Sequence, residues 1–266
     1  MNINSDKNKY FFSTLLLFSL PLILLIFLPI AKMFTDASPG SLIDAIKNPE
    51  VLNALARSLL TAMAAALVSF IFGTPLAYLL ARKNFTGKRL IEGLIDLPIM
   101  IPHPVIGIAI LSLAAKDTFI GMMLYKLGIR IMGSYTGIIA VLTFVGMPFY
   151  LNTAKAGFES VPERLEKVSR SLGASAISTF WRITFPLAWK NMLLGIIMCI
   201  ARAISEFGAV IIVAYHPMTA PVLIYERFTA YGLSYSQPIA IWLIIISLAL
   251  FLSMRLLSKG LNSART

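Results

Sequence analysis

The chain has 266 residues, of which 58% are hydrophobic and 13% charged, and its mean hydropathy is +0.82. Soluble domains are far less apolar, so the composition predicts a single polytopic membrane domain over residues 1–266. The net charge of +11 is explained more simply by basic inner loops of a membrane protein than by a nucleic-acid partner, which we do not expect. The single Cys199 lies in an apolar run, which excludes a disulfide framework and a redox pair.

Six apolar stretches are long enough to cross a membrane, since about 20 helical residues span a hydrocarbon core of roughly 30 Å. We expect the first to be retained, because no convincing small-residue cleavage site follows it at once, although a cleaved signal peptide is the alternative. The predicted fold class is an all-α membrane protein with six transmembrane helices. The expected spans cover about residues 11–31, 52–80, 94–114, 134–151, 187–214 and 238–257.

The polar segment between the first two spans is expected to contain a short helix near Leu42–Ile46. The third span is rich in proline, with Pro98, Pro102 and Pro104 within seven residues. Proline lacks the backbone N–H that a helix needs, so this span is predicted to be broken. Broken backbone at membrane depth is tolerated where protein or a wet cavity covers it, which places the segment near a pathway or inside the bundle.

The longest polar interval is the loop 158–186, FESVPERLEKVSRSLGASAISTFWRITFP, which indicates two short amphipathic helices. Ser160 is the expected N-cap of the first, with Glu163 as its capping-box partner. Gly173 is expected to end this helix in the left-handed conformation. Ser175 is the expected cap of the second helix, and Pro186 is expected to stop it.

The first of these helices carries an apolar stripe on a charged loop, and such a stripe needs a cover. Leu165, Val168 and Leu172 recur at helical spacing and form the stripe. The solvent side is expected to carry two i,i+4 ion pairs, Glu163–Lys167 and Glu166–Arg170. These residues leave three alternatives for what covers the stripe: lipid headgroups, the chain's own bundle or a groove on another protein.

Two charged residues, Arg202 and Glu206, share one helix face inside the fifth span. A charge at the membrane centre costs roughly 3 kcal/mol on insertion scales, so such residues usually face inward and carry function. Either a structural ion pair or a place beside a pathway explains the pair. His103 lies among the prolines and, like His216, lacks a ligand partner at helical spacing, so we expect a hydrogen-bonding role and no metal site.

Six spans place both termini on one side of the membrane. On that side, residues 1–10, 82–92, 152–190 and 255–266 hold 15 Lys and Arg residues, whereas the opposite side holds seven. The richer side is expected to be cytoplasmic. The sequence therefore predicts a multi-pass protein of the cell membrane with both termini and the polar loop in the cytoplasm.

The sequence contains no Walker A loop. Gly87-Lys88 is followed by Arg89 and lacks a glycine five places before it, so the P-loop pattern fails. No Ser/His/Asp set or carboxylate pair is credible as a catalytic site. We expect no enzyme activity and no cofactor in this chain, with ATP and magnesium bound by a partner subunit if ATP powers the protein.

The polar loop supplies a motif: Gly173, nine residues, Ile183, one residue, then Phe185-Pro186. This spacing resembles the signature E-A-A-x-x-x-G-x(9)-I-x-L-P of ABC-importer permeases, in which the loop is a coupling helix that docks in a cleft of the cytoplasmic ATPase. The sequence departs from the signature at Lys167-Val168-Ser169, where Glu-Ala-Ala is usual. Glu166 stands one place early, and Phe185 replaces Leu.

Three further runs refine the resemblance, which extends from about Leu52 to Leu257. Residues 201–209, ARAISEFGA, resemble the A-R-x-L-G-E-F-G-A run of molybdate-, tungstate- and sulfate-class permeases, with Ser205 where Gly is common. Asp96-Leu97-Pro98 with Ile101-Pro102 resembles the third span of that class. Residues 220–228, APVLIYERF, look like the archaeal molybdate/tungstate branch.

The resemblance implies a type I ABC-importer permease: a transmembrane subunit that translocates molybdate or tungstate, with sulfate or another oxyanion as the runner-up. A secondary transporter or channel is the alternative from another class. The implied partners are two ATPase copies, a second copy of the chain, an extracytoplasmic oxyanion-binding protein and membrane lipid. The implied ATPase-docking residues are Glu163, Leu165, Glu166, Val168, Leu172, Gly173 and Ala174, the pathway or gate residues Arg202, Glu206 and His103, and the binding-protein contacts Tyr225, Glu226 and Arg227.

Overall fold

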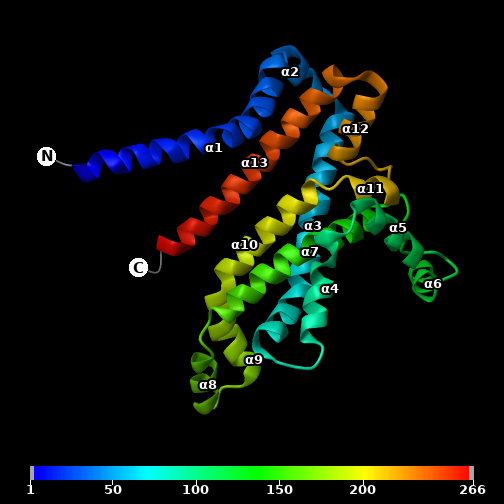
Figure 1. Cartoon of the computed structure of the whole chain (residues 1–266). Coiled ribbons are helices and arrows are strands. Elements are labelled where there is room, and N and C mark those ends of the chain that lie inside the picture. Colours follow the sequence, from blue (N-terminus) through cyan, green and yellow to red (C-terminus); the bar gives the residue numbers. More distant parts are fainter. Residues whose placement is uncertain (1–2, 264–266) are drawn as a thin grey trace.

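A computed structural model of the chain describes the backbone of residues 3–263 and the side chains of residue 12, residues 14–252 and residue 256. The described backbone is helical throughout, without strands, which confirms the expected all-α fold class (Figure 1). The helices are α1 (Ile3–Asp36), α2 (Pro39–Lys47), α3 (Pro49–Arg82), α4 (Lys88–Met100), α5 (His103–Leu113), α6 (Phe119–Lys126), α7 (Tyr135–Glu159), α8 (Glu163–Ser171), α9 (Ala176–Thr179), the π-helical turn η1 (Phe180–Thr184), α10 (Phe185–Ile204), α11 (Gly208–Val213), α12 (Ala220–Tyr231) and α13 (Leu233–Ser263).

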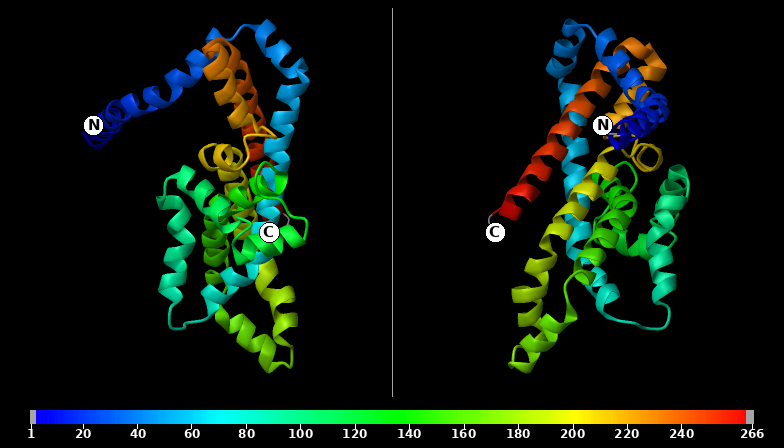
Figure 2. Two further views of the ribbon diagram at one scale, coloured as in Figure 1. Left: turned by 90° about the vertical axis from the view of Figure 1, so that its right-hand side faces the viewer. Right: turned by 60° about the vertical axis from the view of Figure 1, so that its left-hand side comes forward.

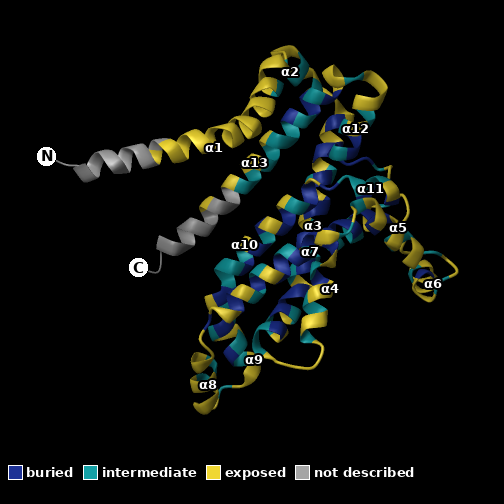
Figure 3. Ribbon diagram, in the orientation of Figure 1, coloured by how far each residue is buried: buried dark blue, intermediate teal, exposed yellow. Residues whose placement is uncertain are grey.

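The buried core lies where α3, α7 and α10 pack together (Figure 3). Tyr150 of α7 is fully buried at this junction, and its hydroxyl shares a hydrogen bond with Thr74 of α3. A Cβ added to Gly73 or Gly195 would come within 2.9 Å or 3.1 Å of the Tyr150 ring. Small residues therefore let the two flanking helices approach the tyrosine from both sides, as in other membrane helix interfaces.

Among the residues that the structure describes, five helices are long and apolar enough to cross a membrane, and the α4–α5 pair, bent by 116°, makes six if it counts as one span. The bend falls at Ile101 and Pro102, so the predicted proline break is confirmed. Asn152 of α7 donates to Asp96 over 2.7 Å, and Lys155 bonds Glu92 over 2.6 Å. These two contacts hold α4 against α7.

The expected fifth span, 187–214, does not correspond to one helix. A helical run begins at Ala176 and ends at Ile204. The non-helical residues Ser205–Phe207 then separate it from α11. Pro186 does not stop the helix, because η1 precedes it and shifts the hydrogen bonding to i−5, with the Phe185 N–H bonded to the Phe180 carbonyl. The proline occupies the first turn of α10, where its missing N–H is tolerated.

Helices α2 and α12 lie at one end of the molecule and α8 at the other, whereas α6 lies to one side between them (Figure 1). At one end, α2 confirms the short helix expected near Leu42–Ile46, and Trp242 of α13 donates to the Leu42 carbonyl over 2.9 Å. At the other end, α8 lies beside the end of α3. The chain ends at residues 1–2 and 264–266 lie outside the described residues.

Helix α1 projects from the rest of the molecule, as the left view of Figure 2 shows. It is exposed or half-exposed at every side chain that is described, and Gln237 of α13 donates to its Met33 carbonyl over 2.6 Å. A long apolar helix with so little cover needs lipid or another chain around it.

Candidate functional site

The start of the polar loop differs from the expected capping box. Pro162 is the N-cap residue of α8 and makes no side-chain cap bond. Ser160 instead ends α7, and its hydroxyl donates to the Gly157 carbonyl over 2.7 Å. The physical reason is that α7 continues to Glu159, well beyond the expected end of the fourth span, so Ser160 is used by the preceding helix.

The end of α8 and the start of α9 agree with prediction. Gly173 has φ +89°, the left-handed conformation that favours glycine, and follows the end of the helix. The Ser175 hydroxyl accepts the Ser178 N–H over 3.2 Å and so caps α9. Ala174 lies half-buried between them and lines the groove beside the two helices.

The apolar stripe of α8 is exposed. Leu165 and Val168 are 42% and 49% exposed, and Leu172 is 84% exposed. With Ile183 they line an open groove of about 620 Å³, whose rim includes the two cations Arg164 and Arg182. The chain's own bundle therefore does not cover the stripe, which leaves lipid headgroups or another protein.

A second face of α8 points inward and is polar. The Glu166 carboxylate bonds Arg82 Nε and Thr184 Oγ1, each over 2.9 Å, and Tyr78 donates its hydroxyl to it over 3.1 Å. The predicted Glu166–Arg170 pair is therefore wrong, because Arg82, the last residue of α3, captures the carboxylate. The predicted Glu163–Lys167 pair is present at 3.1 Å, and the hydrogen bond from Lys167 lowers the pKa of Glu163.

The three candidate pathway residues come together where α10 ends. Arg202 Nη2 lies 2.8 Å from Glu206 Oε2 and 2.7 Å from Nε2 of His103, a residue 99 positions away in the chain. His103 Nδ1 is 3.4 Å from the same carboxylate oxygen. The Glu206 side chain is fully buried, whereas 40% of the His103 side chain is exposed. The cluster therefore joins a buried carboxylate to an accessible imidazole.

Two breaks in the helices position this cluster. Glu206 lies in the break after α10, and its other oxygen accepts the Ala209 N–H over 2.9 Å, which satisfies a free backbone donor at the start of α11. His103 begins α5 after the proline break. A Cβ on Gly208 would lie 3.1 Å from the His103 Cβ, so glycine permits this approach. In the sequence, Gly208 is the residue that could have indicated the break between α10 and α11.

The outer helix α12 contacts the same region. Tyr225 is 46% exposed, and its ring lies 4.9 Å from the ring of Phe207, the residue after Glu206. Arg227 pairs with Glu50 of α3 and with Glu226, and its guanidinium lies over the Tyr231 ring. Of the three expected binding-protein contacts, Glu226 and Arg227 thus pair within the chain.

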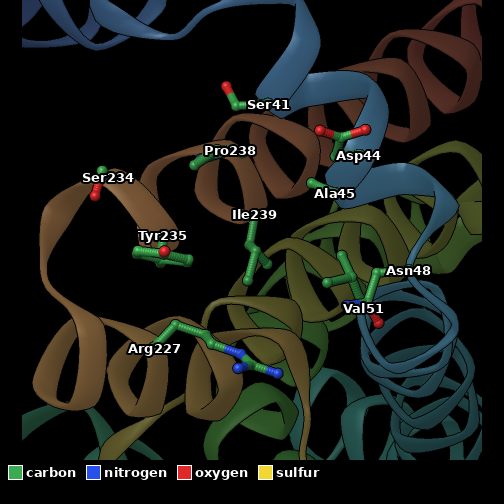
Figure 4. Close-up of a pocket in the computed structure, with 10 residues that line it drawn as sticks. All are labelled: Ser41, Asp44, Ala45, Asn48, Val51, Arg227, Ser234, Tyr235, Pro238 and Ile239. Atoms are coloured by element: carbon green, nitrogen blue, oxygen red, sulfur yellow. The ribbon is translucent and has the colours of Figure 1, made fainter.

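Arg227 also lines a cavity of about 510 Å³ at this outer end, together with α2, α3 and α13 (Figure 4). Asp44 and Tyr235 lie on two other sides of it. Within the described part of the chain, no three His, Cys, Asp or Glu side chains are grouped as a metal site.

The comparisons with known families give one match to a family model. Residues 73–263 match the family described as "Binding-protein-dependent transport system inner membrane component". The chain is 46% identical over 252 residues to the molybdate/tungstate transport system permease protein WtpB of Pyrococcus abyssi, covering 94% of this chain and 95% of that protein. It is 44% identical over 260 residues to WtpB of Thermococcus kodakarensis, covering 97% and 99%.

A more distant relative is named for a different substrate, sulfate. The probable sulfate transport system permease protein cysT of Chlorokybus atmophyticus is 33% identical over 238 residues, covering 87% of this chain and 82% of that protein. The relatives thus fall in the order that the sequence motifs predict, with the molybdate/tungstate proteins nearer than the sulfate protein.

Solved structures share the fold at low sequence identity. A chain of the bacterial alginate ABC transporter, in complex with its alginate pentasaccharide-bound periplasmic protein, matches with a TM-score of 0.76 and 15% identity, covering 98% of each chain. A chain of the inward-facing MetNI methionine ABC transporter matches with a TM-score of 0.59 and 14% identity, covering 80% and 98%. The fold is therefore that of ABC-importer membrane subunits.

Proposed function

The chain belongs to the family of inner-membrane components of binding-protein-dependent transport systems, and on that premise we propose that it is the permease subunit of an ABC importer for molybdate or tungstate. The observation that carries the proposal is identity of 43–46% to four archaeal permeases of this specificity. Sulfate is the second candidate, supported by the 33% relative. Molybdate, tungstate and sulfate are all tetrahedral dianions.

The ATPase is expected on a separate subunit, which binds ATP and magnesium, since the chain has no Walker A loop. The exposed stripe of α8 supports this partner, because it is apolar, uncovered and next to a groove. Two ATPase copies would dock on the α8 helices of two copies of this chain. The exposed length of α1 leaves an apolar surface for the second copy and for lipid.

The outer end of the chain is the proposed contact for an extracytoplasmic oxyanion-binding protein. Tyr225 is the exposed member of the predicted trio, and it touches Phe207 beside the Arg202–Glu206 cluster. Binding at α12 would thus bear directly on the break between α10 and α11. ATP-driven closure of the ATPase pair would move the α8 helices at the inner end, and the two signals together would switch the side to which the pathway opens.

The cluster of Arg202, Glu206 and His103 suits a gate for a dianion. An oxyanion in a low-dielectric space needs a favourable charge, because its bare desolvation cost is large. A free arginine would hold the dianion too tightly for release. Neutralised by Glu206 at 2.8 Å, Arg202 provides a weak local field, and the exposed edge of His103 adds a polar contact.

The test is ATP-dependent uptake in reconstituted vesicles containing this chain, its ATPase and its binding protein. We expect accumulation of radiolabelled molybdate or tungstate that stops without ATP hydrolysis. Competition by unlabelled molybdate, tungstate and sulfate ranks the three oxyanions. Uptake of sulfate in preference to the other two would overturn the proposed specificity, and uptake driven by an ion gradient without ATPase would overturn the class.

The proposed orientation has α8 and both termini in the cytoplasm and α12 outside, which rests on the bias of 15 to seven basic residues. Cysteines introduced as Ser171→Cys on α8 and Ser234→Cys on α13 test it in intact cells. We expect an impermeant thiol reagent to label Ser234→Cys and to spare Ser171→Cys. The native Cys199 is buried and provides an unlabelled background. Labelling at position 171 from outside would reverse the orientation.

A further inference from the structure

Helix α8 is attached to the rest of the chain in an unusual way. All nine of its residues are described, and none of them is buried. Its apolar side chains point outward, so hydrophobic packing does little to hold it. Its attachment therefore depends on polar contacts from its inward face, which are made by Glu166 and Ser169.

Glu166 makes the principal contact. The side chain of Glu166 is 14% exposed and that of its partner Arg82 is 8% exposed. Arg82 also donates Nη2 to the Val161 carbonyl over 2.9 Å, just before α8 begins. With the bonds from Tyr78 and Thr184, both carboxylate oxygens are occupied. Charge-assisted bonds of this kind are stronger than neutral ones, and geometry fixes them in direction.

The partners of Glu166 belong to two helical segments of the core, α3 and the run formed by η1 and α10. Tyr78 and Arg82 form the last turn of α3, a helix of 34 residues. Thr184 is fully buried in η1, directly before α10. A second bond, between Ser169 Oγ and Thr179 Oγ1 at 3.0 Å, links α8 to the same helical run. One carboxylate thus connects α8 to α3 and to the helix that carries Arg202 at its far end.

The chain on the C-terminal side of α8 is poorly suited to this task, and the N-terminal side is held through the same arginine, Arg82, which bonds the carbonyl of the buried Val161. Pro162 precedes the helix and Gly173, with φ +89°, follows it. These connections are short non-helical turns, and such turns absorb a displacement by rotating their dihedral angles. A displacement of the exposed stripe therefore reaches the core through the hydrogen bonds of Glu166, or the turns absorb it.

We propose that Glu166 is a positioning residue that transmits movement of α8 to α3 and α10 together, in addition to the docking role of the exposed stripe. The inference rests on the proposed ATPase-driven function. It separates two tasks of one short helix: Leu165, Val168 and Leu172 hold the partner, whereas Glu166 delivers the motion to the chain's own bundle.

The test measures oxyanion taken up per ATP hydrolysed in the assembled transporter. Glu166→Ala is expected to keep the ATPase bound, because the stripe is intact, and to lower the uptake-to-ATP ratio by about tenfold, the scale of losing a hydrogen bond to a charged group. Glu166→Gln retains an acceptor for Arg82 and Thr184 and should recover most of the ratio. Ser171→Ala is the matched control, since Ser171 lies on the same helix, is exposed, and its hydroxyl bonds only the Lys167 carbonyl among the contacts described.

Thr184→Val provides a second variant in case Glu166→Ala leaves Arg82 unpaired and the protein fails to assemble. It removes one of the three bonds to the carboxylate with no change in charge, and a smaller loss of the ratio is expected. A wild-type ratio in Thr184→Val, or in an assembled Glu166→Ala variant, would overturn the proposal. Loss of bound ATPase from folded Glu166→Ala would also overturn it, since Glu166 would then be a docking contact. Failure of the proposed function itself appears separately, as absent uptake by the wild type.

Discussion

The two arginine–carboxylate clusters of this chain carry the same charges at the two ends of α10, but they are built differently. At the end near α8, Glu166 and Arg82 are nearly buried, and the three hydrogen bonds to the carboxylate come from three different side chains of α3 and η1. At the other end, the Glu206 carboxylate is fully buried beside an imidazole that is 40% exposed, and the helix itself is interrupted. The Glu166–Arg82 cluster is fully hydrogen-bonded and shielded from solvent. The Arg202–Glu206 cluster lies where the interrupted backbone and access to solvent allow rearrangement.

The difference shows that ion pairs in a membrane protein can have different structural roles. A closed, fully bonded pair fixes helices against each other, as at Glu166. In the second cluster Glu206 lies outside any helix, so a change in His103 or in the α10–α11 break alters the pair. Breaking either cluster by single substitutions should have distinct effects.

Removal of Arg202 should cause the largest effect. Arg202→Ala leaves the Glu206 carboxylate buried with the Ala209 N–H and His103 as its remaining neighbours. Loss of one partner of a buried pair typically costs about 3–5 kcal/mol. We expect poor assembly and a lowered Tm, measured by thermal unfolding in detergent, together with loss of uptake.

The double variant Arg202→Ala with Glu206→Ala separates stability from transport. Without the unpaired carboxylate it should fold better than the single variant, yet still fail in uptake if the cluster is the gate. Uptake at the wild-type rate by the double variant would show that the pair is structural and that the gate lies elsewhere.

Leu172→Glu should have the next largest effect, and it acts on the exposed face of α8 rather than on Glu166. Leu172 is 84% exposed, so a carboxylate there does not disturb the fold of the isolated chain. It would place a charge inside the docked interface, and we expect loss of ATPase co-purification and of binding-protein-stimulated ATP hydrolysis. Normal stimulation would mean that the stripe faces lipid, with unchanged Tm as the check that the chain is folded.

Much of the architecture follows from short-range sequence patterns. Proline predicts the α4–α5 break, Gly173 predicts the end of α8, and the spacing of Leu165, Val168 and Leu172 predicts the exposed stripe. The i,i+4 spacing likewise predicts the Arg202–Glu206 pair. These features depend on neighbouring residues of one helix, so they can be read without knowing the tertiary fold.

The features that escaped prediction depend on distant partners. Glu166 has a cation at i+4 but bonds Arg82, 84 positions earlier, and no local pattern ranks these two choices. Ser160 has a capping sequence, yet the unexpected length of α7 determines its role. His103 and Arg202 meet only because two helix breaks bring α5 and α11 together. Tertiary packing, rather than propensity, decides each of these cases.

Tyr225→Ala should have a moderate effect and tests the connection between the outer helix and the gate. Its ring contacts Phe207 at 4.9 Å, and aromatic pairs contribute about 0.5–1.5 kcal/mol beyond their buried area. We expect a several-fold lower stimulation by loaded binding protein, with basal ATP hydrolysis unchanged. Tyr231→Ala, one and a half turns further along α12, is the control, and an equal loss in both variants would point to general disturbance of the helix.

The smallest effect is expected at Glu163, an exposed pair that carries the same charges as the two clusters without their burial. The hydrogen bond from Lys167 lowers the pKa of Glu163 in the folded chain. A lowered folded-state pKa stabilises the fold above the ordinary glutamate pKa of about 4.3, and this stabilisation is lost as the pH falls through the folded-state value. Glu163→Gln should therefore lower Tm slightly at neutral pH and not at all in strong acid. Because exposed pairs are screened, added salt should erase the neutral-pH difference. A loss of uptake comparable to that of Glu166→Ala would show that the charge on α8, rather than the buried hydrogen bonds of Glu166, governs coupling.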